Sequence, residues 1–391
     1  MIPIGDYRFT DDDRAAINRV VDSGRISEHK EVRAFEDEFA DYIGTKYCVA
    51  VSSGTAALIC GLAAMTALEY IKPSANVLIP ALTFIATANA VVLTGHKPIF
   101  SDVENLTFSM GSYEITDDID LVLPVHLLGY TAPMGSIMTK AKMVGALVAE
   151  DAAEAHGAKH FGAMAGSMGL WSAFSFYIAH TVQAGELGAV CTDDRDLAFA
   201  VRSIKAHGRV CTCRVCTRSS GGCPHKDIPH PRFASSFIGY NFKTMEFQAA
   251  LARNQLAGID ENIYARKYNE RALEYGFRSL NGKFINPHYS RYGPFRTVPM
   301  AYPIVLTHTG IRDRVMAEIE SNGVECRPLF NCIPTRQLSY KWHPQALDIF
   351  PVSEYYGDNG FYIGCHQYLS DSDIGKMVSV CCEAIERISN E

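Results

Sequence analysis

Short apolar runs alternate with helix-like segments through the first half of the chain, and this alternation restricts the possible folds more than any other feature. Several runs are continuously apolar, as expected for strands of a sheet whose two faces are both covered by helices. The expected strands are residues 47–51, 76–79, 98–101, 121–125, 146–150, 172–176 and 189–192. The pattern predicts an α/β fold with a mostly parallel sheet flanked by helices.

The helical segments have apolar residues spaced by three and four positions, as in Val32, Phe35, Phe39 and Ile43. The expected helices are residues 11–23, 29–43, 246–263, 311–321 and 374–388, and a later strand is expected at 300–306. A chain of 391 residues is long enough for two or three domains. We expect a large domain over residues 1–255, with a cysteine-rich insert at 209–233, and a smaller C-terminal α/β domain over 256–391.

Composition argues against several classes of protein. The chain has 36 Lys and Arg against 43 Asp and Glu, a net charge of −7, and no basic stripe, which disfavours a nucleic-acid-binding protein. No apolar run is long enough to span a bilayer, so no membrane association is expected. The N-terminus, MIPIGDYRFTDDD, lacks the apolar core of a signal peptide. We therefore expect a cytoplasmic protein.

Two short segments at strand ends are candidate ligand-binding sites. The sequence SSGTAAL, which contains Gly54 and Thr55, follows a strand and begins a helix, so its backbone N–H groups are suited to phosphate, although an ordinary helix cap also explains it. Asp151 ends another strand, where ligands of open α/β sheets gather. A carboxylate there could pair with a pyridinium nitrogen, and a second helix cap is the structural alternative.

Four cysteines gather within thirteen residues. Cys211, Cys213, Cys216 and Cys223 follow the pattern CxCxxC-x6-C among Arg and Gly residues. This spacing indicates a metal or cluster site, because a structural disulfide pair is unusual in a cytoplasmic protein. A zinc ion in an all-cysteine site and an iron–sulfur cluster both fit the four thiolates.

Five separated motifs resemble one family. SGTAAL, PALTFIATANA, EDAAEAHGA, AFSFY and GYNFKTMEFQAA occur in the order and spacing of the DegT/DnrJ/EryC1/StrS family, the pyridoxal-phosphate-dependent sugar aminotransferases of fold type I. The resemblance implies that Asp151 pairs with the pyridine nitrogen, that Phe84 stacks on the ring and that Glu154 lies near the ring hydroxyl. The remaining residues it implies are Gly54, Thr55 and Ser175 for the phosphate, Asn241 for the phosphate of the neighbouring subunit in a homodimer with a shared active site, and Lys243 and Arg336 for the substrate.

One position departs from the family pattern. The family's S-F-Y-x-x-K carries the lysine that binds the coenzyme covalently, whereas this chain has His180 there and no lysine between Lys159 and Lys205. This replacement resembles the NDP-4-keto-6-deoxyhexose 3-dehydratases, which implies noncovalent pyridoxamine 5'-phosphate, or noncovalent pyridoxal phosphate. A histidine that titrates near neutral pH is suited to moving a proton. The implied reaction removes the carbon 3 hydroxyl of a nucleotide-linked 4-keto-6-deoxy sugar.

The cysteine-rich segment also resembles that of one enzyme of this subgroup. A CDP-linked dehydratase of this subgroup carries a [2Fe–2S] cluster in the same stretch, and its C-x-C pair resembles Cys211 and Cys213. Ala153 stands where that enzyme takes a further ligand, so the choice between [2Fe–2S] and [4Fe–4S] stays open. A cluster implies an electron-transfer reductase as partner. Zinc would instead favour a dehydratase regenerated by glutamate. An aminotransferase that uses a distant lysine, a noncatalytic binding protein and an inactive homologue are also compatible with the sequence.

Overall fold

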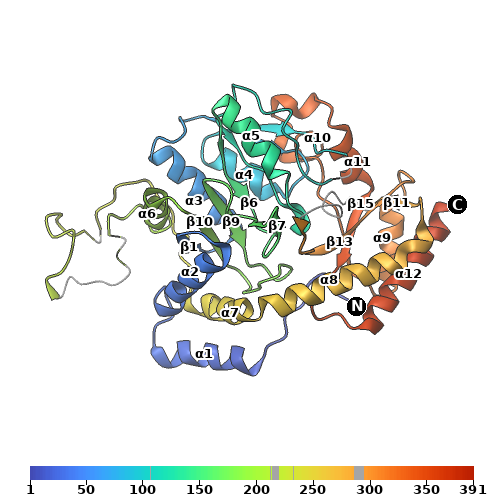
Figure 1. Cartoon of the computed structure of the whole chain (residues 1–391), viewed down its shortest axis with the longest axis horizontal. Helices are drawn as coiled ribbons and strands as arrows, with labels where there is room; N and C mark the ends of the chain where they lie inside the picture. The colour runs from blue at the N-terminus through green and yellow to red at the C-terminus, as the bar shows by residue number, and fades with distance from the viewer. Residues whose placement is uncertain (106, 212, 214–219, 232, 286–294) are drawn as a thin grey trace.

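The computed structural model describes the chain except residues 106, 212, 214–219, 232 and 286–294 (Figure 1). Its centre is one twisted layer built from two four-stranded sheets, ordered β3-β2-β4-β5 and β6-β9-β10-β1. The strands are β1 (Tyr47–Val51), β2 (Asn76–Pro80), β3 (Lys97–Ser101), β4 (Leu121–Val122), β5 (Leu147–Val148), β6 (Glu150–Asp151), β9 (Trp171–Ser175) and β10 (Gly188–Thr192). The two sheets join where β6 follows β5, because the Asp151 N–H donates to the Pro124 carbonyl at 2.9 Å.

The expected α/β fold is confirmed, with one difference in strand direction. β3, β2, β4 and β5 are parallel to one another, and β6 is parallel to β9. β10, however, runs antiparallel to both of its neighbours, β9 and β1. The connection from β9 to β10 contains no helix, so the chain turns back beside β9 instead of crossing over to start a parallel strand. This turn, residues 176–187, carries His180.

Helices cover both faces of this layer. α3 (Gly54–Ala67), α4 (Ile85–Leu93) and α6 (Arg195–Ile204) share one core with alternate sheet residues such as Val49 and Val190. α2 (Lys30–Ile43) and α7 (Glu246–Ala257) pack on the other face, against Cys48, Phe174 and Ala189. α5 (Met134–Val144) covers the same face where it is formed by β2, β4 and β5. The predicted apolar face of α2 is confirmed, since all four of its residues lie in that core.

A second, all-antiparallel sheet forms the core of the C-terminal part. Its strands are β11 (Phe284–Ile285), β13 (Ala301–Leu306), β15 (Gly360–Gly364) and β14 (Cys326–Pro328), in that order. α9 (Arg312–Ser321) and α12 (Asp371–Ser389) pack against it. The N-terminus joins this part, because Ile2 pairs with Val324 and lies in the same core (Figure 1).

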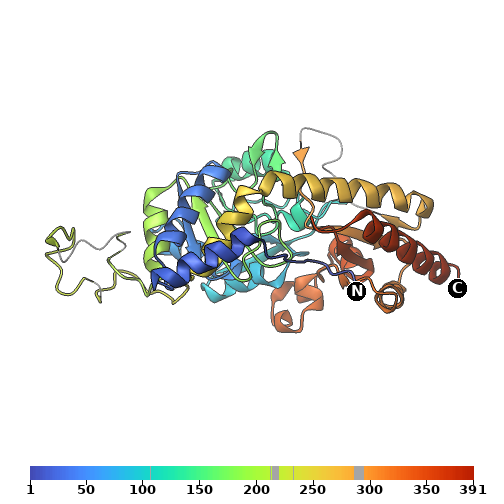
Figure 2. The ribbon, with the colours of Figure 1, turned by 90° about the horizontal axis from the view of Figure 1, so that it is seen from below.

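The helix expected over residues 246–263 is two helices. α7 ends at Ala257, Gly258 lies between, and α8 (Ile259–Gly276) continues for eighteen residues toward the C-terminal sheet (Figure 2). The smaller elements are β7 (Lys159–His160), β8 (Ala163–Met164) and β12 (Phe295–Arg296), which form a third sheet, and the helices α1 (Asp11–Ser23), α10 (Ile333–Arg336) and α11 (Pro351–Asn359). Within the described parts of the chain, no helix combines the length and the apolarity needed to cross a membrane.

Candidate active site

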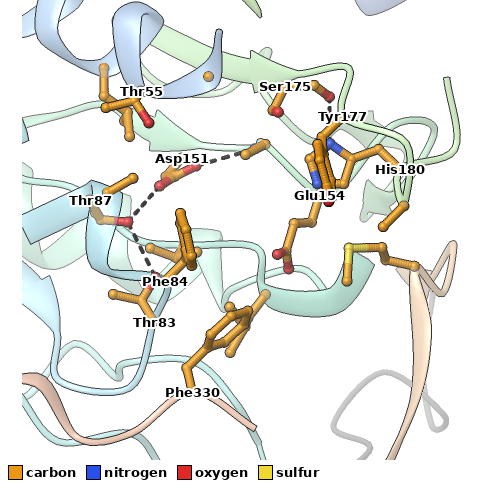
Figure 3. Close-up of a pocket in the computed structure, with 18 of the residues that line it drawn as sticks. Thr55, Thr83, Phe84, Thr87, Asp151, Glu154, Ser175, Tyr177, His180 and Phe330 are labelled. Carbon is orange, nitrogen blue, oxygen red and sulfur yellow. Dashed lines mark hydrogen bonds between the residues drawn. The ribbon is translucent and has the colours of Figure 1, made fainter. Parts of the chain in front are cut away.

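A cavity of about 320 Å³ lies between the central layer and the C-terminal sheet (Figure 3). Its walls come from the β1–α3 turn, the start of α4, the end of β6, the turn after β9 and the C-terminal part. The lining residues are Ser53, Gly54, Thr55, Leu58, Thr83, Phe84, Ala86, Thr87, Val125, Leu127, Asp151, Ala153, Glu154, Ser175, Tyr177, Ala179, His180, Glu186, Met300, Arg327, Phe330 and Tyr362. The structure therefore brings together seven predicted site residues, namely Gly54, Thr55, Phe84, Asp151, Glu154, Ser175 and His180.

One end of the cavity is formed by the N-terminus of α3. The Ser53 side chain caps this helix by accepting a hydrogen bond from the Ala56 N–H at 3.2 Å. The helix is packed tightly here, because a Cβ on Gly54 would lie 2.7 Å from the Cβ of Ser175. The first amide groups of a fourteen-residue helix therefore meet the cavity beside the Ser175 hydroxyl, an arrangement suited to an anion such as phosphate.

Asp151 lines the cavity, and two hydrogen bonds hold its carboxyl group in a fixed orientation. The Thr87 hydroxyl donates to its Oδ2 at 2.8 Å and the Ala153 N–H donates to its Oδ1 at 3.2 Å (Figure 3). Burial raises the pKa of the Asp151 carboxyl above its ordinary value, although these two hydrogen bonds act in the opposite direction. A cationic group in the cavity would offset this cost of burial.

Glu154 lies three residues further along and accepts a hydrogen bond from the backbone. The Leu128 N–H donates to its Oε2 at 2.6 Å. Burial raises the pKa of Glu154 to about 7, and the nearby Asp151 contributes in the same direction. Near neutral pH this carboxyl group can therefore both donate and accept a proton.

His180 lies on the turn between β9 and β10. Its Nδ1 lies 2.8 Å from the Ser175 carbonyl oxygen, which can only accept, so Nδ1 carries the proton. Burial lowers the pKa of His180 to about 4, and the positive charge of Arg266 contributes. The expectation that this histidine titrates near neutral pH is therefore corrected, because at pH 7 the ring is neutral and its Nε2 is the basic atom.

Sequence reasoning did not assign several of the lining residues. Thr87 lies in the first turn of α4 and orients Asp151. Tyr177 lies in the turn before His180, and Phe330 makes an edge-to-face contact with Phe84 at 5.8 Å between ring centroids. Arg327 projects from β14 and donates to Glu325 Oε1 at 2.9 Å. No local spacing in the sequence places the C-terminal segment of Arg327 and Phe330 at the cavity.

Of the residues predicted to contact coenzyme or substrate, three lie outside the cavity of this single chain. Asn241 is exposed on the surface and accepts a hydrogen bond from the Lys243 ammonium group. Their segment lies next to the β1–α3 turn, because the Ser52 N–H donates to the Phe242 carbonyl at 2.8 Å. Arg336, on α10, forms ion pairs with Asp358 at 3.0 Å and Glu354 at 3.4 Å on α11.

Of the residues that the structure describes, none that lines the cavity is a lysine. Lys205, the first lysine after His180 in the sequence, is buried elsewhere. Its ammonium group donates to Glu28 at 2.8 Å and to the Ala50 carbonyl at 2.7 Å. The distant lysine that an aminotransferase would need is therefore not found among the described cavity residues.

The cysteine-rich segment is described only in part. Cys211, Cys213 and Cys223 are each partly exposed, and Cys216 lies outside the described residues. Within the residues that are described, no three His, Cys, Asp or Glu side chains are grouped so that they could hold a metal ion.

Comparison with known proteins extends these observations. The model of the DegT/DnrJ/EryC1/StrS aminotransferase family matches residues 8–381. GDP-perosamine synthase of Caulobacter vibrioides is 31% identical over 351 residues, which cover 88% of this chain and 87% of that protein. The dTDP-4-dehydro-2,6-dideoxy-D-glucose 3-dehydratase of Saccharopolyspora spinosa is 28% identical, covering 97% and 85%. The structure of GDP-4-keto-6-deoxymannose-3-dehydratase (ColD) has the same fold, with a TM-score of 0.87, 23% identity, and coverage of 97% and 100%.

Proposed function

This chain belongs to the DegT/DnrJ/EryC1/StrS aminotransferase family, and we propose that it is a pyridoxamine-phosphate-dependent 3-dehydratase of a nucleotide-linked 4-keto-6-deoxy sugar. Membership makes it a sugar-modifying enzyme of the pyridoxal-phosphate-dependent aminotransferase superfamily. The observation that carries the finer proposal is the neutral imidazole of His180, whose Nδ1–H is held by the Ser175 carbonyl in a cavity where no described residue is a lysine.

The cavity residues fit a phosphorylated pyridine coenzyme. The N-terminus of α3 and the Ser175 hydroxyl suit the phosphate, and the buried Asp151 carboxylate suits a cationic partner such as a protonated pyridine nitrogen. Phe84 can cover one face of the ring, and Glu154 can meet the ring hydroxyl. When bound, the coenzyme supplies an amine for the sugar's carbonyl group and a ring that stabilises negative charge on the adjoining carbon.

His180 is proposed as the residue that moves the proton. Since the Ser175 carbonyl fixes the Nδ1–H tautomer, Nε2 is the atom that can accept a proton from a ligand in the cavity. The lowered pKa keeps Nε2 unprotonated at pH 7, so the residue begins as a base and can return the proton as an acid. Glu154 can supply or accept a second proton, because its pKa of about 7 keeps both forms populated.

The names of the relatives support the proposed substrate, and the position of Asn241 supports the proposed assembly. One of the sequence relatives is named for a GDP sugar and another for a dTDP sugar, which supports a nucleotide-linked sugar as substrate. We propose Lys243 and Arg336 as substrate contacts on the family resemblance. Asn241 is exposed, and its segment lies beside the end of the cavity that suits phosphate. This position supports a homodimer in which Asn241 reaches the phosphate held by the partner subunit.

The cysteines are proposed as ligands of an iron–sulfur cluster, served by an electron-transfer reductase. This proposal depends on the CxCxxC-x6-C spacing, because the described cysteines do not by themselves form a metal-binding group. The test is the iron and zinc content of anaerobically purified protein, with visible and electron paramagnetic spectra. About two or four irons per chain with a cluster spectrum would support the proposal, whereas stoichiometric zinc without iron would replace it with a zinc site and glutamate-dependent regeneration.

The dehydratase proposal is tested on the anaerobically purified protein with pyridoxamine phosphate, GDP- or dTDP-linked 4-keto-6-deoxy sugars and a reductant such as dithionite, which supplies the two electrons needed to replace the hydroxyl by hydrogen. We expect loss of the carbon 3 hydroxyl, seen as the 3-deoxy product by mass spectrometry, and no coenzyme retained after borohydride treatment and denaturation. An amino sugar as the only product, with coenzyme fixed to the chain by borohydride, would instead establish an aminotransferase, the activity after which the matched family is named.

A further inference from the structure

Arg266, on α8, is a fully buried arginine whose five N–H donors all have acceptors. Nε donates to the Gln367 side-chain oxygen at 3.0 Å. Nη1 donates to the carbonyls of Pro299 at 3.2 Å and Met300 at 3.0 Å. Nη2 donates to the carbonyls of Ala179 at 3.5 Å and His180 at 2.9 Å. Each of these acceptors is an uncharged oxygen. The guanidinium group therefore holds these residues in position, and none of the five acceptors neutralises its positive charge.

These five contacts join three parts of the chain. Pro299 and Met300 lead into β13, Gln367 follows β15, and Ala179 and His180 belong to the turn after β9. α8 runs from the central layer to the C-terminal sheet (Figure 1). Arg266 bonds carbonyl groups on both sides, at Met300 before β13 and at His180 in the turn after β9. The arginine therefore ties the position of the His180 backbone to the C-terminal sheet.

The rest of the turn is held by buried polar groups as well. His156 accepts a hydrogen bond from the Val182 N–H at 3.2 Å, and its ring is stacked against Phe176. The Gln183 side chain donates to the Asp6 carbonyl at 2.9 Å, which ties the turn to the N-terminal segment. Of these anchors, only Arg266 bonds the His180 residue itself and carries a full charge.

The charge of Arg266 acts on the surrounding histidines. It contributes to the lowered pKa values of His156, His180 and His366, with burial the larger cause in each. The ionisable groups around His180 come from several elements. They are Arg266 from α8, His156 from the segment after β6, Tyr177 and Glu186 from its own turn, and Asp151, Glu154, Arg327 and Tyr362 from the other cavity walls.

We infer that Arg266 is a positioning residue for His180: its guanidinium group fixes the turn that carries the imidazole and favours the uncharged ring in which Nε2 is free to accept a proton. This inference deepens the proposed function and depends on it only for the role of His180. Two separable properties of Arg266 are involved, because its planar fork fixes the backbone while its charge opposes a second positive charge nearby.

The test separates the two properties with R266K, which keeps the charge and loses the fork, and R266Q, which loses the charge. Histidine Cε1–H resonances are titrated by NMR in the coenzyme-free protein, and the His180 signal is assigned with H180Q. We expect the His180 pKa to rise by about one pH unit or more in R266Q and to stay near its original value in R266K. Amide exchange in residues 177–184 should quicken at least about tenfold in both variants.

The matched control is R253Q, on α7, where the arginine is partly exposed and pairs with Glu31 and Glu38. This variant should leave the His180 pKa and the turn's amide exchange unchanged. An unchanged His180 pKa and unchanged exchange in folded R266Q would overturn the inference. If R266Q does not fold, the result with R266K is decisive, because unchanged amide exchange of the turn in R266K would also overturn the inference. A wild-type protein without dehydratase activity would remove the proposed function and leave these NMR outcomes intact.

Discussion

The cavity has two walls of different construction. One, the strand wall, comprises Gly54 and Thr55, which begin α3 shortly after β1, together with Asp151 and Ser175, which end β6 and β9. The other, the turn wall, comprises Tyr177, His180, Arg327, Phe330 and Tyr362, which lie on the turn after β9 and on the C-terminal part. Strand-wall groups are fixed by the central layer itself, whereas turn-wall groups depend on contacts between distant segments.

The two walls also differ in how they treat charge. On the strand wall, Asp151 receives two hydrogen bonds that favour its carboxylate, and the helix N-terminus offers partial positive charge. On the turn wall, burial keeps His180 uncharged at pH 7. Glu154 lies between them and is half ionised near pH 7. The strand wall therefore holds groups that carry a fixed charge, and the turn wall holds an uncharged side chain that can accept a proton.

The largest expected effect comes from changing the base of the turn wall. H180K should place an amine where the family has its lysine, so we expect the coenzyme to become covalently bound, with visible absorbance and retention after borohydride. Dehydration should fall by about 10²–10⁴-fold, because the proton-accepting imidazole is lost. Absorbance spectra and mass spectrometry measure both outcomes.

H180Q is the matched control for that change. It should lose activity to the same degree without binding the coenzyme covalently, since it offers no amine. A wild-type protein that already retains coenzyme after borohydride, or an H180Q variant with full activity, would show that the turn wall does not supply the base.

The next effect concerns Glu154 and the pH dependence of stability. Its pKa is about 7 in the folded chain against an ordinary value of 4.5, so unfolding releases a proton between these values and the folded state loses stability as pH rises from 4.5 to 7. E154Q cannot ionise and can still accept the Leu128 N–H. Relative to wild type, we expect E154Q to gain about 1–3 kcal/mol between pH 4.5 and 7.5, measured by urea unfolding of the coenzyme-free protein. Parallel stability curves for the two proteins would contradict this assignment.

A smaller effect is expected on the strand wall. T87V keeps the shape of Thr87 and removes the hydroxyl that donates to Asp151 Oδ2. Since this bond favours the carboxylate, its loss should raise the Asp151 pKa further and weaken coenzyme binding by about 1.5–3 kcal/mol, measured by calorimetric titration with pyridoxamine phosphate. T83V is the control, because the Thr83 hydroxyl bonds the Thr87 hydroxyl and acts on the carboxylate only through it, so its effect should be smaller. Equal losses in T87V and T83V would contradict a specific role for the Thr87 hydroxyl.

The strand wall could be predicted from the sequence because it follows from local rules. Apolar runs mark the strands, and a small or acidic residue after a strand is expected at the edge where ligands bind. Gly54, Thr55 and Asp151, which this rule singled out, line the cavity. The family resemblance added Phe84, Glu154, Ser175 and His180. The strands of the central layer agree with the expected ranges within a few residues. The differences are that the strand expected at 146–150 is two short strands, β5 and β6, and that β10 is antiparallel to its neighbours.

The turn wall could not be predicted in the same way. Arg327 and Tyr362 reach the cavity only because the C-terminal sheet folds against the central layer, and no local pattern encodes that approach. The anchoring of His180 by Arg266 joins residues 86 positions apart. The lowered pKa of His180 is a property of burial, which the sequence alone does not reveal.

The smallest expected effects compare two arginines of the C-terminal part. Arg327 lines the cavity, whereas Arg336 pairs with Asp358 and Glu354 on α11. R327Q should raise the KM for the sugar nucleotide about tenfold, because a cavity-facing donor is removed, and R336Q should raise it only about two- to threefold. R336Q should also cost less than about 1 kcal/mol of unfolding free energy, as expected for exposed ion pairs. A larger rise of KM in R336Q than in R327Q would mean that the main substrate contact lies on α10 and that the turn wall extends to that helix.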